Sequence, residues 1–273
     1  MINEKYKTTV IIPCFNASKT IEKTLASLEK QTYKYFQVYI VNDGSTDETL
    51  SAIERYRKGS LLNITVFTKE NAGVSAARNY AINRCNTELI TFLDADDEYD
   101  CGFLNSMIQV LLDNDFDTVA ARYEFTRNAE ETFVLPSKLN YKEVSKYDLV
   151  KLYTHKRIEK INFCGFLYKK KILNQYHIRF DEKIRFGEDT LFIYQYLKYC
   201  KRGGFIDEPL YHYYINEASA THSVTYDIVQ NIEAYKKVVE YWKDDPQYDQ
   251  KWGAYIISRA CLLYTSPSPR DRG

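Results

Sequence analysis

The 273-residue sequence lacks the features that mark several large classes of protein. It has 37 basic and 37 acidic side chains, and this zero formal charge excludes a polybasic nucleic-acid binder and an acidic solvating tail. Its ten glycines form neither a G-x-G-x-x-G nor a G-x-x-x-x-G-K motif, which argues against a dinucleotide cofactor and against a P-loop. G-x-S-x-G and H-E-x-x-H are also absent, so we expect neither a serine hydrolase nor a zincin.

The six cysteines are scattered and include no C-x-x-C pair. This pattern is neither a disulfide framework nor a zinc site, and it is typical of reduced thiols in a cytoplasmic protein. The N-terminus has no apolar signal-peptide core, and no apolar run is long enough to span a membrane. We therefore expect a cytoplasmic protein, with peripheral contact at the inner face of the cell membrane left open. The sequence does not indicate an oligomeric state.

The first half of the chain alternates short apolar runs with amphipathic stretches, an order that predicts strands followed by helices. Four strands are expected, over residues 8–14, 36–41, 64–68 and 88–93. We expect Ser18 to cap the first helix, Ser45-x-x-Glu48 to form a capping box on the second, and the third helix to span 74–84. This order predicts an α/β fold with a Rossmann-like, mostly parallel sheet flanked by helices.

Polar residues follow each of these four strands. Ligands of such sheets bind outside the carboxyl ends of the strands, so the segments expected along one rim are Phe15-Asn16, Asp43-Gly44, residues 69–73 and residues 94–97. The strongest single feature is Asp94-Ala95-Asp96-Asp97, because clustered carboxylates repel one another unless a cation holds them. Such oxygen ligands suit Mn²⁺ or Mg²⁺ bridging a diphosphate. From spacing alone, an acidic loop that caps the next helix is an equally good interpretation.

Three further positions have both a functional and a purely structural interpretation. The carboxylate of Asp43 can accept a hydrogen bond from a base, although N-D-G-S is also an ordinary turn. Arg78 lies in a helix whose N-terminus favours a phosphate, although it is equally well a surface charge. Glu188 and Asp189 open a later helix, either as simple capping charges or as the acidic pair that general-base chemistry requires.

The second half is less regular. We expect a strand over 117–125, a loop and hairpin over 128–141, and helices around 146–153, 170–175, 188–199 and 227–242. The tail, CLLYTSPSPRDRG, differs in composition from everything before it and resembles the translation of a sequencing adaptor. We therefore leave residues 261–273 out of functional reasoning and expect the native sequence to stop near Ala260.

Five motifs in order resemble family 2 glycosyltransferases of the GT-A fold: TTVIIPCFNASKTIEKTLASLEKQTY, VNDGSTDET, NAGVSAARNYAI, FLDADDEY and GEDTLF. The resemblance covers roughly residues 8–216. The positions that match the nucleotide-contacting segments of the family are Pro13, Phe15, Asn16, Asp43, Asn71, Gly73, Arg78, Asp94, Ala95 and Asp96. By this resemblance Asp43 reads the uracil ring, Asp94 faces ribose or metal, and Asp96 is the direct metal ligand.

The resemblance also implies catalytic and further metal-binding residues. Asp189 matches the proposed catalytic base, and Glu188 beside it matches a residue that orients the acceptor or the base. A late histidine completes the metal site in some relatives, and we place His222 in this role ahead of His212. The sequence departs from the family's Y-x-Y-R-x-x-x-x-S segment, because the stretch that begins at Tyr211 has no arginine.

The resemblance implies an inverting, metal-dependent hexosyl- or N-acetylhexosaminyltransferase. Its donor would be a nucleotide-diphospho-sugar, most often a UDP-sugar, and its acceptor a hydroxyl of a glycan or lipid-linked molecule in bacterial surface polysaccharide synthesis. A catalytically inactive sugar-nucleotide-binding protein is one alternative. A nucleotidyltransferase of related fold is another, but it should have a glycine-rich, arginine-containing loop where this chain has Pro13-Cys14-Phe15-Asn16.

These inferences divide the chain into four parts. Residues 1–125 would form the nucleotide-sugar-binding half of a GT-A domain and residues 126–216 its acceptor-binding half. Residues 217–260 would be a C-terminal helical extension that the sequence truncates, and residues 261–273 the non-native tail.

Overall fold

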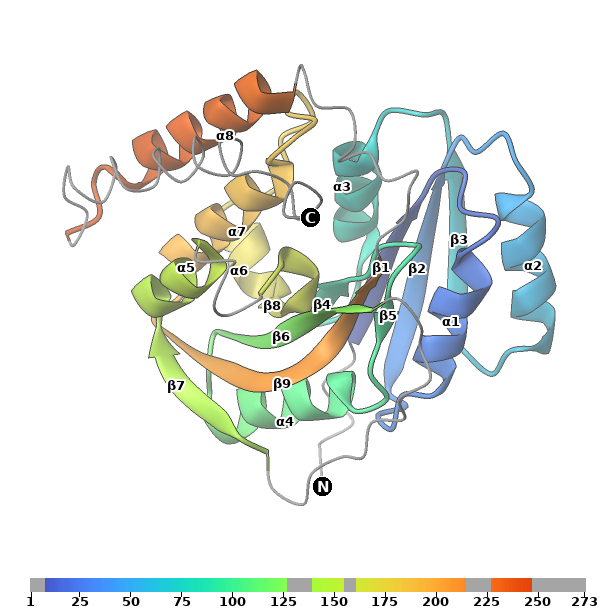
Figure 1. Ribbon diagram of the computed structural model, residues 1–273, viewed down its shortest axis with the longest axis horizontal. Coiled ribbons are helices and arrows are strands. Elements are labelled where there is room, and N and C mark those ends of the chain that lie inside the picture. The colour runs from blue at the N-terminus through green and yellow to red at the C-terminus, as the bar shows by residue number, and fades with distance from the viewer. Residues whose placement is uncertain (1–7, 127–138, 155–160, 215–226, 247–273) are drawn as a thin grey trace, which may run out of the picture.

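The computed structural model describes residues 8–126, 139–154, 161–214 and 227–246 (Figure 1). The first half forms β1 (Thr8–Cys14), α1 (Ile21–Glu29), β2 (Phe36–Asp43), α2 (Thr49–Gly59), β3 (Ile64–Lys69), α3 (Val74–Arg84), β4 (Leu89–Phe92), β5 (Glu98–Tyr99) and α4 (Phe103–Asp113). The second half forms β6 (Thr118–Thr126), β7 (Tyr141–Ser145), α5 (Lys146–Thr154), β8 (Phe166–Lys169), α6 (Lys170–Gln175), α7 (Glu188–Lys198), β9 (Arg202–Tyr214) and α8 (Asp227–Trp242).

Nine strands of the described residues form one sheet, in the order β3-β2-β1-β4-β8-β6-β9-β5 with β7 beside β9. The expected α/β fold is confirmed, and β1 to β4 are parallel to one another. The second half joins them through β8, which is antiparallel to both β4 and β6. The sheet therefore puts the carboxyl ends of β1 to β4 on one rim, next to the strands of the second half (Figure 1).

The helices form where the apolar spacing predicts them, but two expected caps are wrong. α1 begins at Ile21 rather than after Ser18, whose backbone N–H donates to Asp47 Oδ2 at 3.2 Å. α2 begins at Thr49 without a capping bond from the side chain of Glu48, and Ser45 Oγ instead accepts the N–H of Asn16. In both places the serine contacts another loop, through its backbone N–H at Ser18 and through its side chain at Ser45, and does not cap the helix.

The core is continuous across both halves and includes the apolar face of α8. Ala234, Tyr235, Val238 and Trp242 are buried, and the indole N–H of Trp242 donates to the carbonyl of Tyr194 in α7 at 3.0 Å. The helix expected over 227–242 is therefore part of the packed core where the structure describes its side chains. No helix in the described ranges is long and apolar enough to cross a membrane.

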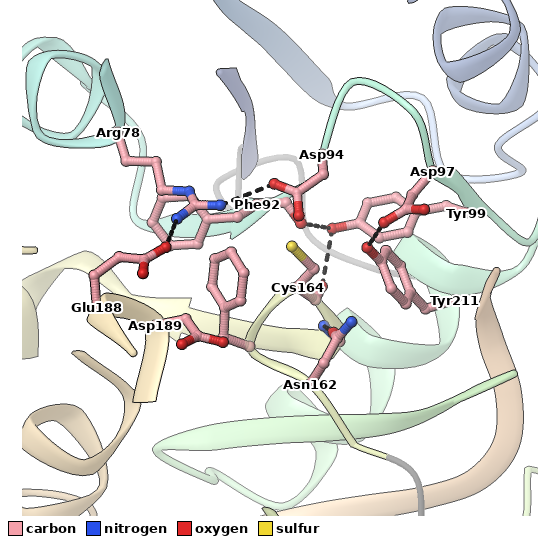
Figure 2. Close-up of polar contacts among 12 residues, drawn as sticks. Arg78, Phe92, Asp94, Asp97, Tyr99, Asn162, Cys164, Glu188, Asp189 and Tyr211 are labelled. Atoms are coloured by element: carbon pink, nitrogen blue, oxygen red, sulfur yellow. Dashed lines mark hydrogen bonds and ion pairs between the residues drawn. The ribbon is translucent and has the colours of Figure 1, made fainter. Parts of the chain in front are cut away.

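One buried hydroxyl joins the two halves beneath the rim. Tyr99 is 3% exposed, and its hydroxyl lies 2.5 Å from the carbonyl oxygen of Phe92 and 3.1 Å from that of Cys164 (Figure 2). The same hydroxyl lies 2.8 Å from Thr91 Oγ1, which itself donates to the carbonyl of Phe166. A single side chain thus satisfies polar groups at the end of β4 and in the turn before β8.

We expect Tyr99→Phe to lower the free energy of unfolding by about 1–3 kcal/mol, because buried polar groups lose their partner while the ring stays in place. Urea unfolding followed by circular dichroism measures this. Tyr176→Phe is the matched control, since Tyr176 is 38% exposed and stacks on Tyr199, and it should change stability by less than about 0.5 kcal/mol. Equal stability of the two variants would contradict the role of the Tyr99 hydroxyl.

Candidate active site

The loops after β1 and β2 are joined at the rim. The N–H of Asn16 donates to Ser45 Oγ at 3.0 Å, and the N–H of Thr46 donates to Asn16 Oδ1 at 2.9 Å. Asn16 adopts a left-handed backbone conformation with φ of 51°. Pro13 stays buried within β1, paired with Val41, whereas Phe15 is 52% exposed. The first loop therefore presents an exposed aromatic ring, and hydrogen bonds to the loop after β2 fix its backbone.

Asp43 ties the loop after β3 to the end of β2. Its buried carboxylate accepts hydrogen bonds from Lys69 Nζ at 2.5 Å and from the backbone N–H groups of Ala72 and Gly73 at 3.1 and 2.8 Å. Gly44 next to it has φ of 74°, and a Cβ there would lie 2.8 Å from the backbone nitrogen of Asn71. Asp43 thus orders the segment that starts α3, and its role in reading a base stays a prediction.

Arg78 is a buried cation held between two carboxylates from distant parts of the chain. It is 3% exposed, and its guanidinium contacts Asp94 Oδ1 at 2.9 Å and Glu188 Oε1 at 3.1 Å (Figure 2). It also lies 4.4 Å from the ring centroid of Phe163 and 5.1 Å from that of Phe180. Burial lowers the pKa of Arg78, but the charges of Asp94 and Glu188 outweigh burial and raise it. The interpretation of Arg78 as a surface charge is wrong.

The acidic segment after β4 divides between an inward and an outward part. Asp97 is 1% exposed and accepts hydrogen bonds from the Tyr211 hydroxyl and, at 2.9 Å, from the N–H of Tyr214. Burial, followed by the charges of Asp94 and Asp96, raises the pKa of Asp97 from 3.8 to about 8. Ala95 is buried between Asp94 and Asp96, which both remain partly exposed at the rim. The segment therefore offers two carboxylates outward and turns the third into the core.

A divalent cation would find two of its ligands in Asp94 and Asp96. In the described ranges no three His, Cys, Asp or Glu side chains gather in a metal-binding arrangement. A pair of carboxylates nevertheless suits Mg²⁺ or Mn²⁺, which often keep waters and bind through one or two carboxylates together with substrate phosphates. The oxygen donors present thus fit a cation that arrives with a diphosphate.

Glu188 and Asp189 lie side by side in the first turn of α7, after Gly187 with φ of 82° (Figure 2). Burial, followed by the charge of Asp189, raises the pKa of Glu188 from 4.5 to about 7 against the lowering effect of Arg78. Asp189 accepts hydrogen bonds from the N–H of Thr190 at 2.6 Å and from the Tyr153 hydroxyl at 3.2 Å. The structure therefore brings this acidic pair to the acidic segment after β4 through Arg78.

Of the two histidines proposed as metal ligands, the structure describes only one. His222 lies outside the described residues. His212 is in β9, with Nδ1 2.9 Å from Glu124 Oε1 and Nε2 3.9 Å from Asp100 Oδ2. Burial lowers the pKa of His212, but its hydrogen bond to Asp100 and the charges of Glu124 and Asp100 raise it overall. Both ring nitrogens of His212 thus face carboxylates other than those of the rim.

Four residues of this region were missed by reasoning from sequence: Tyr153, Phe163, Phe180 and Tyr211. Each contacts an acidic or basic residue of this region that lies 36 to 114 positions away along the chain. A tyrosine-rich sequence with 25 tyrosines gives no local signal that distinguishes these from packing residues.

Comparison with known proteins shows which sequences and structures this chain resembles. The family whose model matches the chain is described as Glycosyl transferase family 2, over residues 9–177. EpsJ of Bacillus subtilis strain 168, an uncharacterized glycosyltransferase, is 27% identical over 78% of this chain and 62% of its own length. The Escherichia coli protein WfgD, named as a UDP-Glc:alpha-D-GlcNAc-diphosphoundecaprenol beta-1,3-glucosyltransferase, is 30% identical over 52% of this chain and 56% of its own. The chain thus spans less than two thirds of these relatives.

Solved structures show the same fold. The crystal structure of S. aureus TarS in complex with UDP-GlcNAc has a TM-score of 0.77 and 22% identity, over 98% of this chain and 74% of that one. The mannosyltransferase PcManGT from Pyrobaculum calidifontis, in complex with GDP-Man and Mn²⁺, has a TM-score of 0.62 and 15% identity, over 99% and 79%. At these identities the likeness establishes the architecture, which is the GT-A fold expected from the sequence.

The raised pKa of Glu188 predicts a pH-dependent effect of Glu188→Gln on stability. Because the folded state binds this proton more tightly than the unfolded state, its stabilising contribution is present below about pH 4.5 and is lost as pH rises through 7. The glutamine cannot lose a proton. We therefore expect the stability of Glu188→Gln relative to wild type to rise by roughly 1–3 kcal/mol between pH 5 and pH 8.

Urea unfolding at the two pH values, with EDTA present, measures this difference. The control is Glu54→Gln, because Glu54 is an exposed residue of α2 whose ion pair with Arg57 lies on the surface. Its relative stability should not change with pH by more than about 0.5 kcal/mol. A pH-independent difference for Glu188→Gln would contradict the burial of an ionisable proton at this position.

Proposed function

Because the chain belongs to glycosyl transferase family 2, we propose that it transfers a sugar from a nucleotide-diphospho-sugar to a hydroxyl of a glycan or lipid-linked acceptor. One observation carries the proposal. Arg78 joins Asp94 of the rim to Glu188 of α7, and so brings a diphosphate-binding segment next to a candidate base, Asp189. The catalytic pair lies beyond the residues matched by the family, so its role rests on this geometry.

A UDP-sugar is the donor that we propose. The name of WfgD specifies UDP-Glc, and the TarS crystal contains UDP-GlcNAc. We propose hexosyl or N-acetylhexosaminyl transfer in bacterial cell-surface polysaccharide or teichoic acid synthesis. The similarity to the minor teichoic acid biosynthesis protein GgaB of Bacillus subtilis supports this proposal. An acceptor linked to a lipid diphosphate is consistent with the acceptor named for WfgD.

We assign the metal to Asp94 and Asp96, with Mn²⁺ or Mg²⁺ as the ion. The PcManGT crystal contains Mn²⁺ beside its nucleotide sugar, which supports this choice. When bound, such an ion neutralises charge on the departing diphosphate. Asp94 Oδ1 accepts a hydrogen bond from Arg78, so Asp94 Oδ2 would be the oxygen that holds the ion.

The chain's own residues then perform a single displacement. The acceptor oxygen bonds to the anomeric carbon while the bond from that carbon to the diphosphate oxygen breaks, and the diphosphate takes the electron pair. Asp189 accepts the proton of the acceptor hydroxyl, a role that contributes about 10²–10⁴-fold to rate. A one-step displacement inverts the anomeric configuration. Glu188, fixed by Arg78, borders the same space and orients the acceptor.

Asp189→Asn tests the base. We expect transfer to fall by about 10²–10⁴-fold with UDP affinity unchanged within about twofold, because the amide cannot accept the proton but keeps the shape of the side chain. Radiolabelled donors and calorimetry measure the two quantities. Asp115→Asn is the matched control, because the Asp115 side chain is 95% exposed at the end of α4, and it should transfer like wild type.

Normal transfer by Asp189→Asn would overturn the assignment of the base. The donor itself is found by incubating wild-type protein and Mn²⁺ with a panel of nucleotide sugars and measuring hydrolysis. A protein that binds UDP but hydrolyses and transfers none of them would instead be a sugar-nucleotide-binding protein without catalytic activity.

Removal of the metal gives an independent test. We expect EDTA to weaken UDP binding by about tenfold or more in wild type and Mn²⁺ to restore it, because a cation between Asp96 and the diphosphate screens their repulsion. Asp96→Asn should bind UDP with little response to Mn²⁺, whereas Asp115→Asn should respond like wild type. Calorimetric titrations with and without Mn²⁺ distinguish these cases, and equal Mn²⁺ dependence of Asp96→Asn would exclude Asp96 as a ligand.

A further inference from the structure

The Asp189 carboxylate is anchored at both of its oxygens. Oδ1 accepts the N–H of Thr190 at 2.6 Å, and Oδ2 accepts the hydroxyl of Tyr153 at 3.2 Å. Oδ1 also accepts the Thr190 hydroxyl at 3.4 Å, so Oδ2 is the oxygen that keeps a lone pair for a further proton among the contacts described. Two anchors on different atoms fix the rotation of the carboxylate about its last bond. The plane in which it can receive a proton is therefore set before any acceptor arrives.

The anchor from Tyr153 comes from a separate helix, α5, and is itself held tightly. Tyr153 is 1% exposed and meets the ring of Tyr194 edge to face at 6.1 Å between centroids. Thr154 Oγ1 and the Tyr194 hydroxyl lie 2.5 Å apart, which joins α5 to α7 at the next position. Burial, followed by the charge of Asp189, raises the pKa of Tyr153 well above its ordinary value, so the hydroxyl keeps its hydrogen.

Glu188 and Asp189 are neighbours in one helical turn but have different partners. Tyr153 donates only to Asp189 of this pair among the contacts described, while Arg78 reaches Glu188. The two carboxyl groups are therefore oriented by separate parts of the fold. A hydrogen bond donated to a carboxyl group favours its charged form, so removal of the donor should change the pH dependence of a reaction that uses this group.

We propose that Tyr153 is a positioning residue of the transfer reaction, whose hydroxyl holds the Asp189 carboxylate in one orientation by donating a hydrogen bond to it. This inference rests on the proposed function, in which Asp189 is the base. It predicts a change in the pH dependence of the reaction, which a tyrosine that only fills space would not produce.

Tyr153→Phe removes one oxygen and leaves the ring packing. We expect the acid limb of the pH profile of the single-turnover rate to move up by about one pH unit, and the plateau to fall by about tenfold. The KM for the donor should stay within about twofold. Site-specific 3-fluorotyrosine at position 153 makes the hydroxyl a stronger donor, and it should move the acid limb in the opposite direction.

Tyr147→Phe is the matched control, because Tyr147 lies on the same helix and donates to Asp245 away from the site. Its pH profile should match wild type, and the thermal midpoint and UDP affinity of every variant establish folding. An unshifted acid limb in both Tyr153 variants would overturn the inference, as would an equal shift in Tyr147→Phe. If Asp189→Asn is inactive but Tyr153→Phe keeps the wild-type profile, this inference alone fails, whereas an active Asp189→Asn refutes the base itself.

Discussion

The ion pairs of Arg78 are the interaction on which the arrangement of this site depends. A buried guanidinium without partners costs several kcal/mol, so the fold must supply carboxylates on both sides of it. Asp94 comes from the end of β4 and Glu188 from the start of α7, with 93 intervening residues between them. These ion pairs therefore hold the start of α7 against the end of β4, where the polar residues of the two halves meet.

Burial also limits how many negative charges the site carries. Asp97 is turned into the core, where burial and neighbouring carboxylates favour its protonated form and Tyr211 donates to it. Burial has the same effect on Glu188. Asp94, Asp96 and Asp189 remain partly exposed to solvent. Five acidic residues in one region thus have different tasks because their surroundings differ, a distribution that the neutral overall composition conceals.

The parts of this arrangement that could be predicted from sequence are those set by local periodicity. Residues 8–14 and 74–84 were predicted as a strand and a helix with the bounds observed, because apolar alternation and helical spacing act over a few neighbours. The caps expected at Ser18 and Ser45 do not form, because these residues contact Asp47 and Asn16 in other loops. Contacts between loops that are distant in sequence could not be predicted from local patterns. The contact of Tyr153 with Asp189 joins two helices and has no local signature.

The loop between β3 and α3 is also ordered before any ligand binds. Asp43 holds the N–H groups of Ala72 and Gly73, so the start of α3 is fixed by a carboxylate on β2 rather than by the cap of its own helix. Gly44 must be small there, because its φ of 74° and the backbone of Asn71 leave no room for a Cβ. A loop ordered in this way loses little conformational entropy when a nucleotide binds, and the affinity gained goes to contacts with the ligand. The two hydrogen bonds on Asp189 have the same effect at the start of α7, so the carboxylate that we propose as the base is also oriented before any ligand binds.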